Sequence, residues 1–129
     1  EARVRDEFPK IAAVFHNRIE KDMTLDSNAT IQYITGKNSL YLTSEETRVE
    51  SEYNTYKYPG LPIGPISGPG EVAIKAVLYP EEDMMDPEKP YLYFVLMDPN
   101  EGRHVFNYDY DAHVKDKKKY EHLWKDVAN

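Results

Sequence analysis

Residues 51–70, SEYNTYKYPGLPIGPISGPG, restrict the fold of this chain more than any other segment. Proline lacks a backbone donor and glycine weakens regular structure, so neither a helix nor a strand can continue through this stretch. The segment therefore predicts a long loop in the middle of the chain. Two interpretations stay open: a rigid surface crossover, or a preorganised rim for an extended ligand, because proline reduces the entropy lost on ordering. The breaking residues are Pro59, Gly60, Pro62, Gly64, Pro65, Gly68, Pro69 and Gly70.

Before this loop the sequence predicts two helices. Apolar residues recur at three- and four-residue steps over residues 6–22, which is typical of one face of an amphipathic helix with Pro9 in its first turn. Residues 27–34 form a second helical pattern that ends near Gly36. Thr43 or Ser44 can cap a short turn at SEETRV.

After the loop, residues 71–79 predict a helix that Pro80 closes. Its apolar side is expected to comprise Val72, Ala73, Ala76, Val77 and Tyr79. The runs YLYFVLM and RHVFNY flank the turn sequence DPNEG and predict a hairpin. Residues 109–127 predict a charged surface helix anchored by Tyr120, Leu123, Trp124 and Val127. The expected fold class is α+β, with several helices around a small, mainly antiparallel sheet and the Gly/Pro-rich loop bordering an open cleft.

Length and composition exclude several classes of protein. The 129 residues suit one domain, and a net charge of −7 disfavours a nucleic-acid binder, which needs Lys and Arg to neutralise phosphates. Without cysteine, disulfides and thiolate metal sites are excluded, and no apolar run approaches the ~20 residues that span a bilayer. Because Glu1 opens a helix-compatible pattern without a Met or a cap, the chain is expected to be a fragment of a longer protein.

The histidines and carboxylates do not by themselves identify an active site. None of the four His residues forms the HExxH spacing of a zinc hydrolase, so no metal is expected. His104 is either a hydrogen-bonded structural residue or a cleft-lining one, and His16 is expected on a solvated face. His113 cannot be placed from the sequence. No GxSxG, P-loop or GxGxxG motif is present, and 23 carboxylates are too many to nominate a pair by spacing.

The cluster SEYNTY, residues 51–56, is suited to sugar binding. Amide side chains form bidentate hydrogen bonds with hydroxyl and acetamido groups, and Tyr faces pack on the apolar sides of sugar rings. An Asn-anchored turn with exposed Tyr side chains explains the same residues equally well. Composition alone does not decide between the two interpretations.

Read in order, five blocks give the chain a resemblance to the YceG-like endolytic murein transglycosylases of the MltG type. These blocks are EARVRDEFPKIAAVFHNRI, DMTLDSNATIQY, SEYNTYKYPGLPIGPISGPG, PYLYFV, and HVF followed by His113 nine residues after His104. The family has its catalytic glutamate fourteen residues before the Phe of its VFxNR block, where this chain has Glu1 before Phe15. Glu52, Asn28 and Ile63 depart from the family's usual Pro, Asp and Pro.

The resemblance implies a lytic transglycosylase that needs no cofactor. It would cleave between N-acetylmuramic acid and N-acetylglucosamine inside nascent peptidoglycan strands and leave an anhydromuramyl end, with Glu1 as the single acid and base. Tyr53 and Asn54 are the leading substrate-binding candidates, followed by Ser51, Thr55 and Gln32. Residues 1–129 would be the C-terminal catalytic domain, truncated at its N-terminal side, of a protein whose anchor and LysM-like region precede it.

The same resemblance implies a place at the extracytoplasmic face of the plasma membrane of a bacterium. Glycan strands, and cell-wall synthases with division and elongation proteins, are the expected partners. An alternative function is a glycan-binding or scaffold module of this machinery that has lost catalysis. Pyridoxal-phosphate lyase chemistry, a label also attached to the family, needs a Schiff-base Lys and a phosphate cradle. Lys10, Lys21 and Lys75 lie in helical patterns without any phosphate motif.

Overall fold

The computed structural model describes residues 4–37 and 42–125 and has the predicted α+β class. Within the described residues, four α-helices, three short 3-10 helices and one two-stranded antiparallel sheet follow one another along the chain. Their bounds are η1 Arg5–Glu7, α1 Phe8–Glu20, α2 Asn28–Thr35, η2 Glu46–Arg48, α3 Glu71–Leu78, η3 Glu82–Met84, β1 Tyr93–Asp98, β2 Arg103–Asn107 and α4 Tyr110–Lys125.

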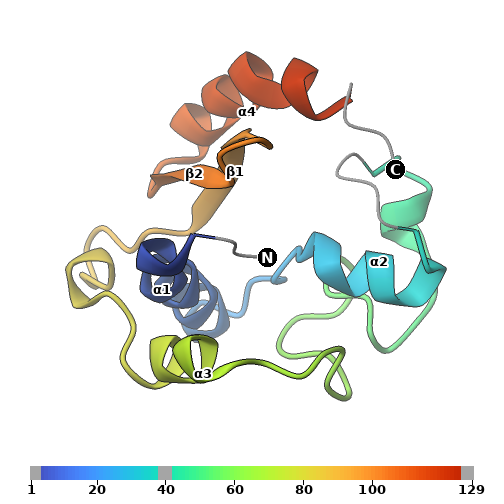
Figure 1. Ribbon diagram of the computed structural model, residues 1–129, viewed down its shortest axis with the longest axis horizontal. Coiled ribbons are helices and arrows are strands. Elements are labelled where there is room, and N and C mark those ends of the chain that lie inside the picture. Colours follow the sequence, from blue (N-terminus) through green and yellow to red (C-terminus); the bar gives the residue numbers. More distant parts are fainter. Residues whose placement is uncertain (1–3, 38–41, 126–129) are drawn as a thin grey trace.

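Helix α1 lies at the centre of the packing. It contacts α3, η3 and β1, and its inner face buries Ile11, Ala12, Ala13 and Val14. Small Ala side chains allow the neighbouring elements to approach the helix closely, and Pro9 lies near its start, where a missing N–H costs nothing. Figure 1 shows the hairpin and α4 above α1 and α3 below it, with α2 on the right of the view, apart from these elements.

Two buried polar side chains of α1 hold the chain that returns from α3. Asn17 Nδ2 donates to the carbonyl oxygens of Met84 and Tyr91, both at 2.9 Å. The Arg18 guanidinium donates to Leu92 O at 2.6 Å and to Thr24 O at 2.7 Å. Because the carbonyls of Met84, Tyr91 and Leu92 lie in the segment before β1, these bonds fix where the hairpin begins.

The hairpin has the predicted position. Val95 pairs with Val105 and Leu96 with His104, and the register shifts between Leu96 and Asp98. Gly102, at a φ of +74°, adopts the left-handed conformation that the turn requires. Helix α4 packs across the strands, and Trp124 Nε1 donates to Leu96 O at 2.7 Å. Trp124 is buried and anchors the helix as expected, Tyr120 is half-buried and Leu123 is more exposed, and Val127 lies outside the described residues.

Helix α2 is held by the segment that follows it rather than by the sheet. Ser27 precedes the helix in an extended conformation, and Gly36 ends it at a φ of +75°. The hydroxyl of Thr55 accepts from Ser27 N–H at 2.9 Å and lies 2.9 Å from the Thr30 hydroxyl. Beyond this network residues 51–70 contain turns and bends without helix or strand, which confirms the predicted interruption.

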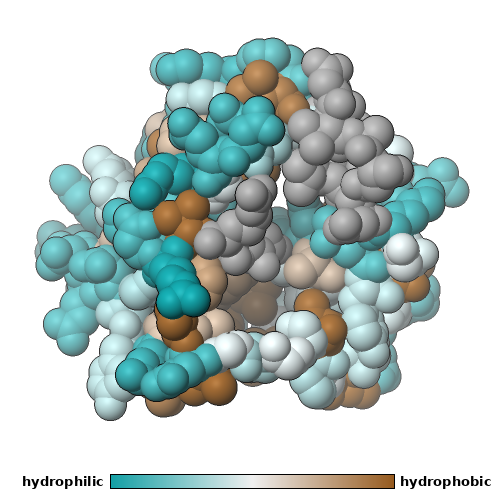
Figure 2. Space-filling model, viewed as in Figure 1, coloured by the Kyte–Doolittle hydropathy of each residue, from teal (hydrophilic) through white to brown (hydrophobic). Residues whose placement is uncertain are grey.

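Helix α3 shows where the predicted apolar face was too broad. Ala76 is buried and Val72 and Ala73 are half-buried, but Val77 and Tyr79 are exposed, because α1 covers only a narrow strip of this short helix. His16 is half-buried, and its Nε2 lies 2.9 Å from Val77 O in a contact that is exposed to solvent. Exposed apolar side chains of α3 and of the Gly/Pro-rich segment are consistent with the separate brown patches among teal and white at the lower edge of Figure 2.

None of the helices formed by the described residues has the length and hydrophobicity needed to cross a lipid bilayer.

Replacing Asn17 by Ala is expected to lower the free energy of unfolding by about 2–4 kcal/mol, because two carbonyls lose their buried donor. Urea denaturation followed by circular dichroism measures this change. Glu20→Ala, an exposed substitution on the same helix, serves as the control and is expected to change stability by less than about 0.5 kcal/mol. Equal stabilities of the two variants would contradict the proposed role of Asn17.

Candidate functional site

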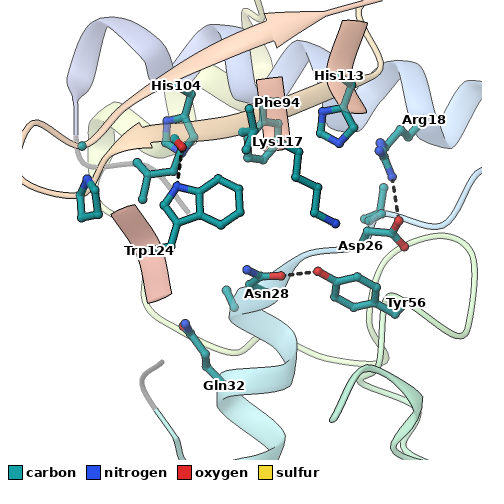
Figure 3. Close-up of a pocket in the computed structure, with 16 residues that line it drawn as sticks. Arg18, Asp26, Asn28, Gln32, Tyr56, Phe94, His104, His113, Lys117 and Trp124 are labelled. Atoms are coloured by element: carbon teal, nitrogen blue, oxygen red, sulfur yellow. Dashed lines mark hydrogen bonds and ion pairs between the residues drawn. The ribbon is translucent and has the colours of Figure 1, made fainter. Parts of the chain in front are cut away.

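A pocket of about 530 Å³ lies between the hairpin with α4 on one side and α2 on the other. Figure 3 shows side chains from both sides converging on it. The lining residues come from distant parts of the sequence, from Arg18 on α1 to Trp124 on α4. Its described lining comprises Arg18, Leu25, Asp26, Asn28, Ala29, Gln32, Tyr56, Phe94, Val95, Leu96, Pro99, Gly102, His104, His113, Lys117 and Trp124.

One side of the pocket is apolar. Phe94, Val95 and Leu96 come from β1, and Trp124 comes from the last turn of α4. The indole N–H of Trp124 is already bonded to Leu96 O, so the ring contributes its apolar surface. Aromatic rings of this kind suit the apolar faces of sugar rings, which carry C–H groups. The sequence identified Trp124 only as an anchor of α4.

His104 combines the two roles that the sequence left open. It is buried and hydrogen-bonded to Glu7, yet it lines the pocket. Both Glu7 carboxylate oxygens lie 3.1 Å from the His104 backbone N–H, and His104 Nδ1 lies 3.1 Å from Oε1. A carboxylate that accepts from Nδ1–H fixes the imidazole tautomer and its orientation. The sequence did not reveal Glu7, because its partner is 97 positions away.

His113 now has a definite place, on the first turns of α4. Its ring stacks on Tyr93, with centroids 4.9 Å apart and planes inclined by 22°, and it lines the pocket. Burial lowers the pKa of His113, and the nearby charges of Lys117 and Arg18 lower it further. The imidazole is therefore neutral at neutral pH. Its Nδ1 is buried and has no hydrogen-bond partner among the described residues.

Arg18 and Asp26 form the charged edge next to α2. Arg18 Nη1 lies 3.5 Å from Asp26 Oδ2, and Thr24 Oγ1 donates to Asp26 Oδ1 at 2.7 Å. Asp26 has a φ of +51°, a left-handed conformation that is uncommon for a residue with a side chain. Such strained positions persist only where surrounding contacts hold them, and they concentrate at functional sites.

Gln32 is the one predicted substrate-binding residue that lines this pocket. It lies on α2, facing the strand side across the opening (Figure 3). Tyr56, in the same cluster as the other candidates, also lines it, and its hydroxyl donates to Asn28 Oδ1. Of residues 51–70, Tyr56 is the sole described lining residue, so the prediction that the Gly/Pro-rich loop borders the cleft stays a prediction.

Asn54 and Thr55 are buried, with only 1% of each exposed. The Asn54 amide donates to the carbonyls of Thr47 and Val49 and its oxygen accepts from Tyr56 N–H, so it organises the turn. The Thr55 hydroxyl is hydrogen-bonded to the Ser27 N–H and to the Thr30 hydroxyl at the start of α2. These contacts support the Asn-anchored turn that the sequence offered as an alternative.

Tyr53 and Ser51 belong to the same turn. Ser51 Oγ accepts from Tyr53 N–H at 3.1 Å, and the Tyr53 ring packs on Tyr33 with centroids 4.9 Å apart. A methyl group at Gly64 would lie 3.1 Å from the Tyr53 hydroxyl, so the loop backbone passes close to this ring. Neither Tyr53 nor Ser51 is among the described residues that line the pocket. Glu1, the predicted catalytic acid, lies outside the described residues.

Within residues 4–37 and 42–125, no cluster of three or more His, Asp or Glu side chains is arranged to hold a metal ion.

Comparison with known proteins gives consistent matches. The sequence model of the YceG-like family matches residues 1–119. An endolytic murein transglycosylase of Bacillus subtilis (strain 168) is 36% identical over 120 residues, covering 93% of this chain and 31% of that protein. One of Streptococcus pneumoniae (strain D39) is 35% identical over 118 residues, covering 88% of this chain and 20% of that protein. The chain thus spans a third or less of these relatives.

Among solved structures, the crystal structure of a YceG-like protein from Listeria monocytogenes matches with a TM-score of 0.70 and 40% identity. The match covers 81% of this chain and 32% of that one. The two proteins are therefore similar both in fold and in amino-acid sequence over the matched part.

The environment of His113 predicts a pH effect on stability. Because the folded pKa is lowered from 6.5, the unfolded chain takes up a proton first, so stability falls as the pH drops below 6.5 towards the folded pKa. His113→Phe keeps a ring against Tyr93 and removes this contribution. The variant is expected to lose less stability than the unmodified protein between about pH 7.5 and pH 5, measured by urea denaturation.

The matched control for this measurement is His122→Phe, an exposed substitution on the same helix. It is expected to keep the pH dependence of the unmodified protein. Identical pH profiles for the His113→Phe variant and the unmodified protein would show that His113 is not held neutral by its surroundings.

Proposed function

This chain belongs to the YceG-like family, and from that membership we propose that it is the catalytic part of an endolytic peptidoglycan transglycosylase. The observation that carries the proposal is the match over residues 1–119, together with relatives 35–36% identical that are named endolytic murein transglycosylases. Because the chain spans only part of those relatives, the proposal concerns the reaction of the intact protein that contains it.

The proposed reaction breaks the bond between N-acetylmuramic acid and N-acetylglucosamine with one carboxyl group. Glu1, protonated, donates its proton to the departing glycosidic oxygen as the bond to the anomeric carbon breaks. The resulting carboxylate then accepts the proton of the muramyl hydroxymethyl group, whose oxygen attacks the same carbon and closes the anhydro ring. Ordinary glycosidases need a second carboxylate for water or for a covalent intermediate. An internal hydroxyl instead gains its advantage from proximity.

The pocket supports a glycan as substrate. Its apolar side, with Trp124 and Phe94, suits sugar ring faces, and its polar edge supplies amide and hydroxyl groups such as those of Gln32 and Tyr56. We assign Gln32 a direct sugar contact, while contacts by Tyr53 and Ser51 remain predictions. The contacts of Asn54 and Thr55 support a positioning role, because their polar atoms hold the turn and the start of α2.

The wider setting follows from the same proposal. Residues 1–129 would form the C-terminal catalytic domain of a protein that acts in the cell envelope, at the extracytoplasmic face of the plasma membrane. Peptidoglycan strands would be its substrate, and cell-wall synthases with division and elongation proteins its neighbours.

The decisive experiment compares the intact protein with its Glu1→Gln variant on purified peptidoglycan. The unmodified protein is expected to release fragments with anhydromuramyl ends, detected by mass spectrometry. The variant is expected to lose activity by on the order of 10²–10⁴-fold, because it cannot supply the proton. Glu20→Gln, an exposed substitution on α1, is the control and is expected to retain full activity.

Two results would contradict this function. Anhydro products from both the unmodified protein and the Glu1→Gln variant at equal rates would remove Glu1 from the mechanism. Glycan binding without products from any form of the intact protein would instead favour the non-catalytic binding module.

A further inference from the structure

We propose that Lys117 and His113 form a carboxylate-binding subsite at the α4 side of the pocket, which recognises the acidic substituent of a muramyl residue. The inference rests on the proposed function and adds to it a determinant of substrate choice. The acidic group is either the lactyl carboxylate of an unsubstituted muramyl residue or a carboxylate of the peptide attached there.

The first observation is the distribution of charge around the pocket. Arg18 is engaged by Asp26 and by the carbonyls of Thr24 and Leu92. Lys117 is exposed and forms no ion pair with any described carboxylate, although the chain as a whole carries a net charge of −7. Figure 3 shows its side chain extending into the pocket between Trp124 and Asp26. An unneutralised cation at the pocket of an acidic protein attracts an anionic ligand group.

The second observation is the buried Nδ1 of His113, which lacks a hydrogen-bond partner among the described residues. Leaving such an atom without a partner is unfavourable, and an oxygen atom of a ligand in the pocket would supply the missing hydrogen bond. Stacking on Tyr93 fixes the ring, so the donor does not have to be ordered when the ligand binds. A neutral imidazole donating N–H beside an ammonium group matches the acceptor-only chemistry of a carboxylate.

None of the neighbouring described carboxylates forms an ion pair with Lys117. Asp26 has one carboxylate oxygen bonded to Thr24 and the other near Arg18. Asp116, the carboxylate that acts on His113 from α4, accepts a hydrogen bond from Asn107 Nδ2 at 2.9 Å. Glu121 lines an adjoining pocket together with Lys117, but the two form no ion pair in the described structure. The positive charge of Lys117 is therefore not neutralised by an ion pair with Asp26, Asp116 or Glu121.

The test measures binding by calorimetry to the intact protein in a Glu1→Gln background, so that no ligand is cleaved. Three ligands are compared: peptide-bearing glycan strands, strands whose peptides have been removed by an amidase, and chito-oligosaccharides, which carry no carboxylate. Lys117→Ala is expected to weaken binding of carboxylate-bearing strands by about three- to tenfold and to leave chito-oligosaccharide binding unchanged. Lys117→Arg is expected to retain most of the affinity.

Lys118→Ala is the matched control, because Lys118 is an exposed neighbour on α4 that does not line the pocket. It is expected to bind all three ligands as well as the parent protein. An effect of Lys117→Ala on peptide-bearing strands alone identifies the peptide carboxylate as the ligand group. An effect on amidase-treated strands identifies the lactyl carboxylate. Equal losses for all three ligands, or no loss for any of them, would overturn the subsite.

A second readout follows the His113 imidazole by NMR during a pH titration. A bound carboxylate favours the protonated ring, so carboxylate-bearing strands are expected to raise the pKa of His113 from its lowered free value, whereas chito-oligosaccharides leave it unchanged. An unchanged titration curve with bound acidic strands would overturn the role of His113. Both readouts are independent of turnover, so they fail separately from the proposed cleavage reaction.

Discussion

The fold depends on hydrogen bonds that two α1 side chains make to backbone carbonyls of a much later segment. Asn17 and Arg18 bond the chain at Met84, Tyr91 and Leu92, immediately before β1 begins. Buried amide and guanidinium groups need such partners, since leaving them unpaired would cost more than the bonds themselves contribute. Their geometry therefore specifies the position of the hairpin, and with it the apolar wall of the pocket.

The pocket is built from groups whose polar atoms are mostly committed before any ligand arrives. Trp124 bonds Leu96, His104 bonds Glu7, and Arg18 faces Asp26. These contacts orient side chains without using their remaining faces, which is how a site is preorganised. His113 differs, because its Nδ1 is buried without a partner in the described structure and its pKa is lowered mainly by burial. Trp124, His104 and Arg18 therefore shape the pocket, whereas the Nδ1 atom of His113 is available to bond a ligand.

The sequence predicted the elements well because their signals are local. Apolar periodicity located α1, a helical pattern ending near Gly36 located α2, and DPNEG located the hairpin turn. The ordered motif blocks predicted the family, which the comparisons confirm. Contacts between distant residues were not predictable, since nothing near Glu7 indicates His104. The Asn-anchored turn at Asn54 was one of two interpretations that the sequence left open, and the hydrogen bonds of Asn54 support it. The outer residues of α3, Val77 and Tyr79, were misjudged because periodicity does not show how wide a strip the neighbouring helix covers.

The joining of the first and last thirds of the chain also affects how the domain assembles during synthesis. Helix α1 leaves the ribosome early, but the carbonyls of Met84, Tyr91 and Leu92, which Asn17 and Arg18 bond, are translated about 70 residues later. The His104 that meets Glu7 follows 97 residues after it. Until then Asn17 lacks its native acceptors, and Arg18 has only its nearby partners, Thr24 O and Asp26. Native contacts with such large sequence separation slow folding, because the loop entropy is lost before the contacts form. The nascent chain therefore reaches its native packing only once β2 has emerged.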